Sequence, residues 1–193
     1  MLIAIEGVDG AGKTTQAARL AEALNAHLVR EPGGTKLGER VRDLLLDASS
    51  DDAPTPRAEA LLYAAARAQL VERVLAPLLD AGGTVVCDRF LGSTLAYQGG
   101  GRGLDPAALR RISLFATGGR VPDRTILLSI DPRAAAMRRG SETPDRMEDE
   151  GLAFQQRVAR TYATLASDDP TWRVVPATGT PDEVFARVRA AAG

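Results

Sequence analysis

Residues 7–15 read Gly7-Val8-Asp9-Gly10-Ala11-Gly12-Lys13-Thr14-Thr15, and this stretch decides the fold. It fits the pattern G-x-x-x-x-G-K-[ST], in which backbone N–H groups wrap a phosphate at the start of a helix. Residues 2–5 form an apolar run typical of a buried strand, and apolar residues recur at helical spacing after the loop, at positions 17, 20, 21 and 24. These two flanks favour a phosphate-binding loop over an ordinary glycine-rich turn. All nine residues are therefore predicted to bind ATP phosphates, with Lys13 at the β- and γ-phosphates and Thr14 on Mg²⁺.

Composition excludes several classes of protein. The chain has 193 residues, 25% of them charged, and a net charge of −1, so it does not resemble a general nucleic-acid or membrane-surface binder. The single cysteine, Cys87, rules out an internal disulfide and follows two valines, which predicts a buried structural thiol in a reducing cytoplasm. We expect no signal peptide and no membrane span. The only histidine, His27, is predicted to be structural.

Strands and helices alternate along the whole chain. Strands are predicted at 2–5, 27–29, 84–88, 125–131 and 172–175, and helices after the phosphate-binding loop, at 37–46, from 56 toward 80, from 106, from 132, at 148–165 and from 181. Pro77 is expected to kink or shorten the last turn of the long helix, and residues 99–103 are expected to be an irregular loop. This alternation predicts an α/β fold of the P-loop kinase type, with a five-stranded parallel sheet and helices on both faces. We expect one domain over residues 1–193.

The carboxyl ends of the predicted strands share one edge of the sheet, where such folds bind ligands. The phosphate-binding loop follows the first strand, Arg30-Glu31-Pro32-Gly33-Gly34 follows the second, Asp88-Arg89 ends the third and Asp131 ends the fourth. Asp88 is suited to orient metal-bound water, and Arg89 to hold a substrate phosphate with two hydrogen bonds. A structural ion pair at the strand end is the alternative for this pair.

A second site is indicated by aromatic and arginine residues. Tyr63 and Arg67 lie four apart on the long helix and share a face, so they fit a planar base, by stacking and by bonding its edge. A core tyrosine beside a solvated arginine is the competing interpretation. Arg138, Arg139 and Arg146 lie in a segment broken by glycine and proline, suited to a lid at about 138–149 that supplies positive charge to the transition state. A solvated charged surface is the alternative there.

Taken together, the motifs resemble the bacterial thymidylate kinase family. The blocks that carry the resemblance, in family order, are Ile5–Gln16, Arg30-Glu31-Pro32-Gly33-Gly34-Thr35, Tyr63–Leu70, Asp88-Arg89-Phe90, Ala96-Tyr97-Gln98-Gly99-Gly100-Gly101-Arg102-Gly103 and Asp145-Arg146-Met147-Glu148. The resemblance implies transfer of phosphate from ATP to dTMP with Mg²⁺, held by Thr14 and Asp88. It also implies a homodimer formed through helices, for which the apolar residues 44–46 and 70–79 are candidates.

The resemblance implies a role for each matching residue. Tyr63 corresponds to the aromatic residue that stacks on thymine, Arg67 to the residue that bonds the base edge, and Thr94 to a polar residue near the ring. Tyr97 is expected under the deoxyribose, where it excludes a 2′-hydroxyl. The other substrate-binding residues are Asp9 at the sugar 3′-OH, Arg89 at the dTMP phosphate, Gln98 and Arg102 in the glycine-rich block, and Glu148 near metal and sugar.

The catalytic arginine is expected in the lid, because the phosphate-binding loop carries Ala11 and no arginine. Arg139 or Arg138 is the first candidate and Arg146 the next, beside Lys13 and Arg89 as the other catalytic residues. Phe90 departs from the tyrosine that is usual in the family after Asp-Arg. No general base is expected, because a phosphate monoester with a second pKa near 6 is already largely a dianion at pH 7.

Two other functions remain open from the sequence. The first is a kinase for a different small acceptor, such as a deoxynucleoside or another monophosphate. The second, from another class, is a nucleotide-dependent binding module or switch. A guanine-nucleotide switch requires an Asn-Lys-x-Asp base-reading motif, which the sequence lacks.

Overall fold

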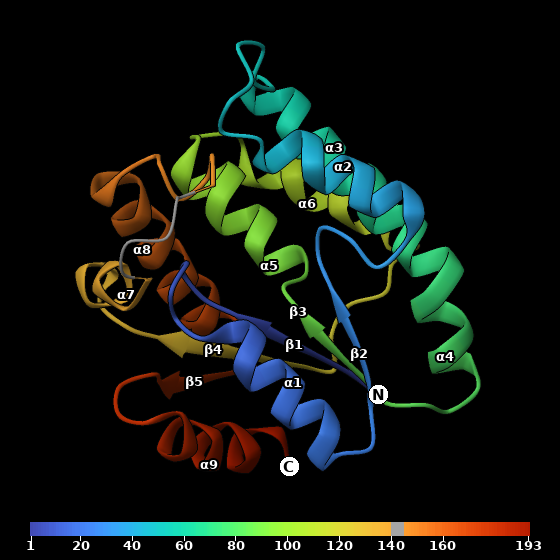
Figure 1. Ribbon diagram of the computed structural model, residues 1–193. Coiled ribbons are helices and arrows are strands. Elements are labelled where there is room, and N and C mark those ends of the chain that lie inside the picture. The colour runs from blue at the N-terminus through green and yellow to red at the C-terminus, as the bar shows by residue number, and fades with distance from the viewer. Residues whose placement is uncertain (140–144) are drawn as a thin grey trace.

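The computed structural model describes residues 1–139 and 145–193, with the side chain of Arg139 outside the described part. Its centre is a five-stranded parallel sheet in the order β2-β3-β1-β4-β5 (Figure 1). The strands are β1 Leu2–Glu6, β2 His27–Arg30, β3 Val85–Asp88, β4 Arg124–Ser129 and β5 Trp172–Pro176. The predicted sheet is confirmed. The order changes direction beside β1, so the phosphate-binding loop lies at the point where α/β sheets bind ligands.

Helices lie on both sides of the sheet, with α1 and α9 over one face and the long helix α3–η1–α4 on the other (Figure 1). Their bounds are α1 Lys13–Ala23, α2 Lys36–Leu46, α3 Pro56–Leu70, η1 Val71–Leu75, α4 Ala76–Asp80, α5 Leu91–Thr94, η2 Leu95–Gly101, α6 Pro106–Ala116, α7 Pro132–Arg139, α8 Leu152–Asp168 and α9 Pro181–Ala192. No helix within the described ranges has the length and apolar composition needed to cross a membrane.

Successive side chains of β1 point alternately into two hydrophobic clusters of the core. Ile3 and Ile5 pack in one cluster with residues of α1 and α9, whereas Leu2 and Ala4 pack in another with residues of α3 and η1. Strands that are buried on both faces read as continuous apolar runs, which explains why β1 has no polar alternation. Cys87 is fully buried in the second cluster, where burial raises the pKa of its thiol well above the usual value. The predicted structural cysteine is confirmed.

The long helix reaches Asp80 as the sequence predicted, but it changes from α-helix to π-helix and back to α-helix on the way. Residues Val71–Leu75 form π-helical turns, directly before the short α4 that contains Pro77. Proline cannot donate the hydrogen bond that an α-helix requires at its position, and wider turns relieve that conflict. The proline therefore alters the turns before it and does not end the helix.

The prediction of an irregular loop at residues 99–103 is wrong for its first part. The π-helix η2 extends from Leu95 to Gly101 and packs along α8. A Cβ added at Gly101 would lie 2.5 Å from the Phe154 ring, and one at Gly100 would overlap Thr161. The glycines therefore permit close approach of two helices, a requirement that is invisible in a sequence pattern.

The helix predicted from residue 148 begins four residues later, at Leu152. The side chain of Asp145 accepts hydrogen bonds from the backbone N–H groups of Met147 and Glu148, at 2.9 and 3.0 Å. These bonds stabilise a tight turn, and Gly151 then adopts a left-handed φ of 83° before α8 starts. The turn keeps residues 145–148 at the edge of the sheet, next to the site.

Candidate active site

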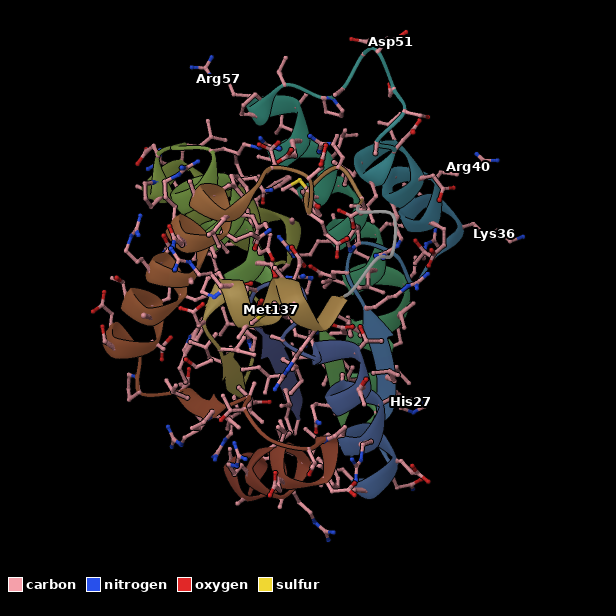
Figure 2. All side chains as sticks on the ribbon, turned by 60° about the vertical axis from the view of Figure 1, so that its left-hand side comes forward. His27, Lys36, Arg40, Asp51, Arg57 and Met137 are labelled. Atoms are coloured by element: carbon pink, nitrogen blue, oxygen red, sulfur yellow. The ribbon has the colours of Figure 1, made fainter. Side chains whose placement is uncertain are left out.

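The carboxyl edge of the sheet holds a cavity of about 480 Å³. Most of the residues predicted for the site line it: Asp9, Gly10, Gly12, Lys13, Thr14, Thr15, Tyr63, Asp88, Arg89, Thr94, Tyr97, Gln98 and Glu148. Gly7, Val8 and Ala11 belong to the same loop but do not line the cavity. His27 lies at the outer edge of the sheet, away from the cavity, as predicted (Figure 2).

The phosphate-binding loop presents Lys13 at the first position of α1. Gly12 precedes the helix with a φ of 89°, a left-handed conformation that glycine adopts without strain. The Lys13 ammonium donates to the Val8 carbonyl at 2.7 Å and lies 3.8 Å from Oδ1 of Asp9. The cation is thus held inside the loop, beside the free N–H groups of the helix N-terminus, an arrangement that binds phosphate.

Burial disfavours the charged form of Lys13. The pKa of this side chain is lowered to about 8, first by burial and then by the positive charge of Arg89, while Asp9 opposes the shift. A bound triphosphate brings negative charge next to the ammonium and raises its pKa again. Binding of ATP is therefore coupled to uptake of a proton by Lys13.

We expect ATP affinity to fall as the pH rises above 8. Below pH 8 Lys13 is already protonated, and above it the free protein must take up a proton to bind, so the Kd rises by up to about tenfold per pH unit. Isothermal titration calorimetry at pH 9, in two buffers of different ionisation enthalpy, should report uptake approaching one proton. Lys13→Arg serves as the control, because an arginine stays protonated in this range. Equal heats in both buffers would contradict the coupling.

Thr14 and Asp88 meet beside the loop. The Thr14 hydroxyl donates to Oδ2 of Asp88 at 2.6 Å, and Asp88 lies at the end of β3 with 8% of its surface exposed. Its other oxygen, Oδ1, is buried without a hydrogen-bond partner among the described residues. A buried acceptor of this kind is costly unless a ligand satisfies it. A hydroxyl and a carboxylate, both hard oxygen donors, suit Mg²⁺ bound through water and phosphate.

Arg89, Asp9 and Tyr97 form a bonded cluster that lines the cavity beside Lys13. The guanidinium of Arg89 pairs with Oδ1 of Asp9, and the Tyr97 hydroxyl donates to Oδ2 of the same carboxylate at 2.8 Å. Burial alone would raise the pKa of Asp9, but Arg89 and Lys13 hold it down at about 2. The cluster therefore brings the cations of Arg89 and Lys13 together around the carboxylate of Asp9.

The turn that carries Arg89 is held by a buried glutamate. Arg89 adopts a left-handed φ of 70°, which is uncommon outside glycine. Glu6, fully buried at the end of β1, accepts hydrogen bonds from the backbone N–H groups of Phe90 and Ser93, at 2.9 and 3.1 Å, and from the Tyr162 hydroxyl at 2.8 Å. The Arg89 guanidinium also donates to Ser93 Oγ at 3.3 Å. Glu6 thus fixes the backbone on both sides of the turn.

Arg67 lies behind the cavity wall, where only 1% of its surface is exposed. Its Nε donates to Glu31 at 2.8 Å, and its two terminal nitrogens each donate to Thr94 Oγ1 at 3.1 Å. Thr94 and Tyr63 line the cavity in front of it. The alternative of a solvated arginine is excluded, because Arg67 is buried and ion-paired.

Of the remaining predicted arginines, Arg102, Arg138 and Arg146 are not among the residues that line the cavity. Arg102 and Arg146 both donate to Glu59, a fully buried carboxylate of α3. Arg138 donates to the Ala177 carbonyl at 2.6 Å, next to the loop that follows β5. Arg139 is the last residue of α7, and its side chain lies outside the described residues, as does the lid segment 140–144.

Three buried glutamates were not singled out from the sequence: Glu6, Glu31 and Glu59. Glu6 and Glu31 each organise one of the arginines described above and Glu59 organises two, and each glutamate is at most 5% exposed. A signal existed for Glu59, which lies one turn before Tyr63 and two before Arg67 on the same helical face. Glu6 lies at the end of an apolar strand, and nothing in the sequence alone shows that the backbone N–H groups of Phe90 and Ser93 bind to it.

The fold and this cavity define a class of protein. A phosphate-binding loop with an acidic residue at the end of the neighbouring strand characterises P-loop proteins that bind a nucleoside triphosphate and transfer or hydrolyse its phosphate. The family model described as thymidylate kinase matches residues 5–188. The chain belongs to the thymidylate kinase family.

Individual relatives agree with this assignment. The chain is 47% identical over 199 residues to a thymidylate kinase from Synechococcus sp. (strain WH7803), with 98% of this chain and 93% of the relative covered. It is 48% identical over 200 residues to one from Deinococcus radiodurans, covering 99% and 95%. A crystal structure of thymidylate kinase from Ehrlichia chaffeensis superimposes with a TM-score of 0.82 at 30% identity, covering 100% of this chain and 98% of that one.

Proposed function

We propose that this chain transfers the γ-phosphate of ATP to dTMP, giving dTDP and ADP, and that the cavity at the carboxyl edge binds both substrates. The reaction serves dTTP synthesis. One observation supports this use of the cavity above the others: the same space is lined by the phosphate-binding loop and by Tyr63, Thr94 and Gln98, which suit a base. Residues 1–193 act as one kinase domain with a lid at about 138–149, in the cytoplasm.

The acceptor is held mainly by residues of α3, α5, η2 and the turn after β3, together with Asp9 of the phosphate-binding loop. Tyr63 stacks on thymine, while Thr94, backed by Arg67, faces the edge of the ring. Tyr97 packs under the deoxyribose and Asp9 receives its 3′-OH, with Glu148 near the sugar. Arg89 binds the dTMP phosphate, and Arg102 supports this site from the glycine-rich block.

The chemistry requires positioning and charge, because the acceptor is already a dianion near pH 7. Lys13 and the N–H groups of residues 7–15 hold the ATP phosphates, while Arg89 keeps the attacking oxygen in line. Burial of this cluster strengthens each electrostatic contact as charge develops on the transferred group. A glutamate or histidine acting as general base is not needed.

Mg²⁺ fits the oxygen donors of Thr14 and Asp88. When bound, the ion would neutralise part of the negative charge of the phosphates. The buried Oδ1 of Asp88, unpartnered in the described part of the chain, and the adjacent Thr14 hydroxyl are the protein groups that hold it, directly or through water. The lid then supplies a further cation, with Arg139 or Arg138 as the first candidate and Arg146 as the next.

A panel of acceptors tests the function. ADP release from Mg²⁺–ATP should be fast with dTMP, weaker with dUMP, and near background with UMP, dCMP, dAMP and thymidine. The thymine methyl discriminates only about 10–200-fold, whereas the ribose hydroxyl meets Tyr97 and should be rejected more strongly. Rapid turnover of another acceptor would overturn the assignment of the base pocket. Tight ATP binding with no turnover would favour a binding module.

We further propose a homodimer formed through α2, α3 and α6. Of the stretches singled out from the sequence, Leu45, Leu70 and Leu75 are buried in the core, and Leu44 stays exposed. The neighbouring helices expose further large apolar side chains, listed with their exposed fractions: Leu61 56%, Leu114 37% and Phe115 90%. These helices lie side by side (Figure 1), and a continuous apolar surface of this kind marks an association face.

Phe115→Asp is expected to convert the dimer to a monomer, because it places a charge on the apolar surface at its most exposed side chain. Light scattering coupled to size exclusion, over a tenfold range of concentration, measures the mass. Met137→Asp is the matched control, since Met137 is also an exposed residue on a helix, 77% exposed on α7 (Figure 2), and should leave the mass unchanged. A wild-type monomer, or a dimer that tolerates Phe115→Asp, would refute this interface.

A further inference from the structure

Glu59 is a buried acidic residue that has no role in the proposed phosphate transfer. It lies on α3, 0% exposed, and is not among the residues that line the cavity. A carboxylate removed from water is stable only with several donors. Glu59 has three donating side chains: Gln98 Nε2 at 2.8 Å, Arg102 at 3.0 Å and Arg146 at 2.7 Å.

The two arginines already have other partners. Arg102 also pairs with Glu150 and lies over the Phe154 ring, and Arg146 also donates to the Leu45 carbonyl at 2.7 Å. Gln98 differs from them because it lines the cavity. It follows Tyr97 and lies four residues after Thr94 on η2, on the side that faces the predicted base site.

The bond between Glu59 and Gln98 fixes which end of the amide faces the cavity. Both oxygens of Glu59 accept hydrogen bonds, from Gln98 and from its two arginine partners. The carboxylate therefore takes the NH₂ group of Gln98, and the amide oxygen is the end turned away from Glu59. Without Glu59 the amide has two orientations, one offering an acceptor to the ligand and one offering a donor.

We propose that Glu59 is a positioning residue that sets the base specificity of the site, by holding the amide oxygen of Gln98 toward the base. The inference rests on the proposed function. Thymine and uracil carry a hydrogen-bond donor at N3, whereas cytosine has a lone pair there. A fixed acceptor forms a hydrogen bond with N3 of thymine or uracil and is repelled by the lone pair of cytosine. A site with a fixed hydrogen-bonding pattern discriminates strongly against a mismatched ligand.

The test compares kcat and KM for dTMP, dCMP and ATP in Glu59→Gln and the wild type. A glutamine at 59 donates as well as accepts, so Gln98 is free to turn. We expect KM for dTMP to rise about tenfold, the ratio of kcat/KM for dTMP over dCMP to fall about tenfold, and KM for ATP to stay within about twofold. Glu150→Gln is the matched control: it removes one negative charge beside Arg102 without touching Gln98, and should change none of these values.

Gln98→Leu separates positioning from a merely structural effect. If Glu59 acts through Gln98, then Glu59→Gln adds no further rise in KM for dTMP when Gln98 is already leucine. A Glu59→Gln enzyme that keeps the wild-type dTMP/dCMP ratio, or whose effect on KM adds to that of Gln98→Leu, overturns the inference. Failure of the wild type to phosphorylate dTMP would instead overturn the proposed function.

A measurement on the wild type covers the case in which Glu59→Gln does not fold. The side-chain NH₂ signals of Gln98, assigned by their loss in Gln98→Leu, should exchange slowly with water both without and with dTMP, since that group stays on Glu59. Fast exchange in the free protein, or loss of protection when dTMP binds, would show that the amide is not held in this orientation.

Discussion

Lys13→Met is expected to lower kcat for dTMP phosphorylation about 10³-fold, which is the scale of removing a preorganised cation from a developing phosphate charge. The ammonium lies buried in the loop, bonded to Val8 and 3.8 Å from Asp9, so no water can replace it at the same place. KM for dTMP should change little, since Asp9 keeps its pairing with Arg89. Single-turnover kinetics with saturating ATP separates the chemical step from binding.

Two variants bracket this result. Lys13→Arg keeps the charge but places a larger group where only 6% of the side chain is exposed, and it should fall between methionine and the wild type. Arg19→Met changes a basic residue of the same helix that pairs with Asp182 on α9, and it should leave kcat unaltered. If kcat of Lys13→Met stayed within tenfold of the wild-type value, another cation would have to stabilise the charge on the γ-phosphate.

Arg89→Met is expected to lower kcat/KM for dTMP about 10³-fold. The variant loses two charge-assisted hydrogen bonds to the acceptor phosphate, each of which contributes about 1.5–3 kcal/mol. The pKa values of its neighbours shift as well. The pKa of Asp9 rises from about 2, because Arg89 is the stronger of the two cations that hold it down. The pKa of Lys13 rises from about 8, because the repulsion by Arg89 is gone.

The second effect gives a specific signature. ATP binding by Arg89→Met should retain its affinity to higher pH than the wild type, while dTMP binding is lost. Ser93→Ala is the control: it removes the 3.3 Å hydrogen bond from the Arg89 guanidinium, together with the contacts of the Ser93 hydroxyl to Glu6 and Tyr162, and leaves the charge of Arg89 in place. We therefore expect kcat/KM to fall less than tenfold. Equal losses of ATP and dTMP binding in Arg89→Met would indicate collapse of the loop and not loss of a phosphate ligand.

Local patterns in the sequence were enough for the architecture. The five strands are short apolar runs, and the helices begin at residues that cap them, as at Asp105 and in the capping box of Thr180 and Glu183. Parallel order follows from their alternation, because each crossover helix returns the chain to the same edge. Most of the cavity wall was predictable for the same reason, since Asp88, Arg89 and the phosphate-binding loop all follow strand ends.

Helix details were less predictable where packing between distant segments overrides local preference. Glycines at 100 and 101 suggest a loop when only neighbours in sequence are considered, yet they let η2 approach α8. The turn at 145–151 depends on a side chain that bonds the backbone two and three residues ahead, which shortened the predicted helix. In both cases a contact absent from the sequence pattern determined the conformation.

The sequence by itself determined that a triphosphate-binding loop lies at the edge of a parallel sheet, since a strand, a glycine-rich loop and a helix start are adjacent in the chain. Only the tertiary structure decided how the arginines are used. Glu6, Glu31 and Glu59 are separated by 36 to 156 residues from the hydrogen-bond partners described above, and folding brings them into contact at 2.7–3.1 Å. A buried charge must find an opposite charge or a donor, and which one it finds depends on the three-dimensional packing.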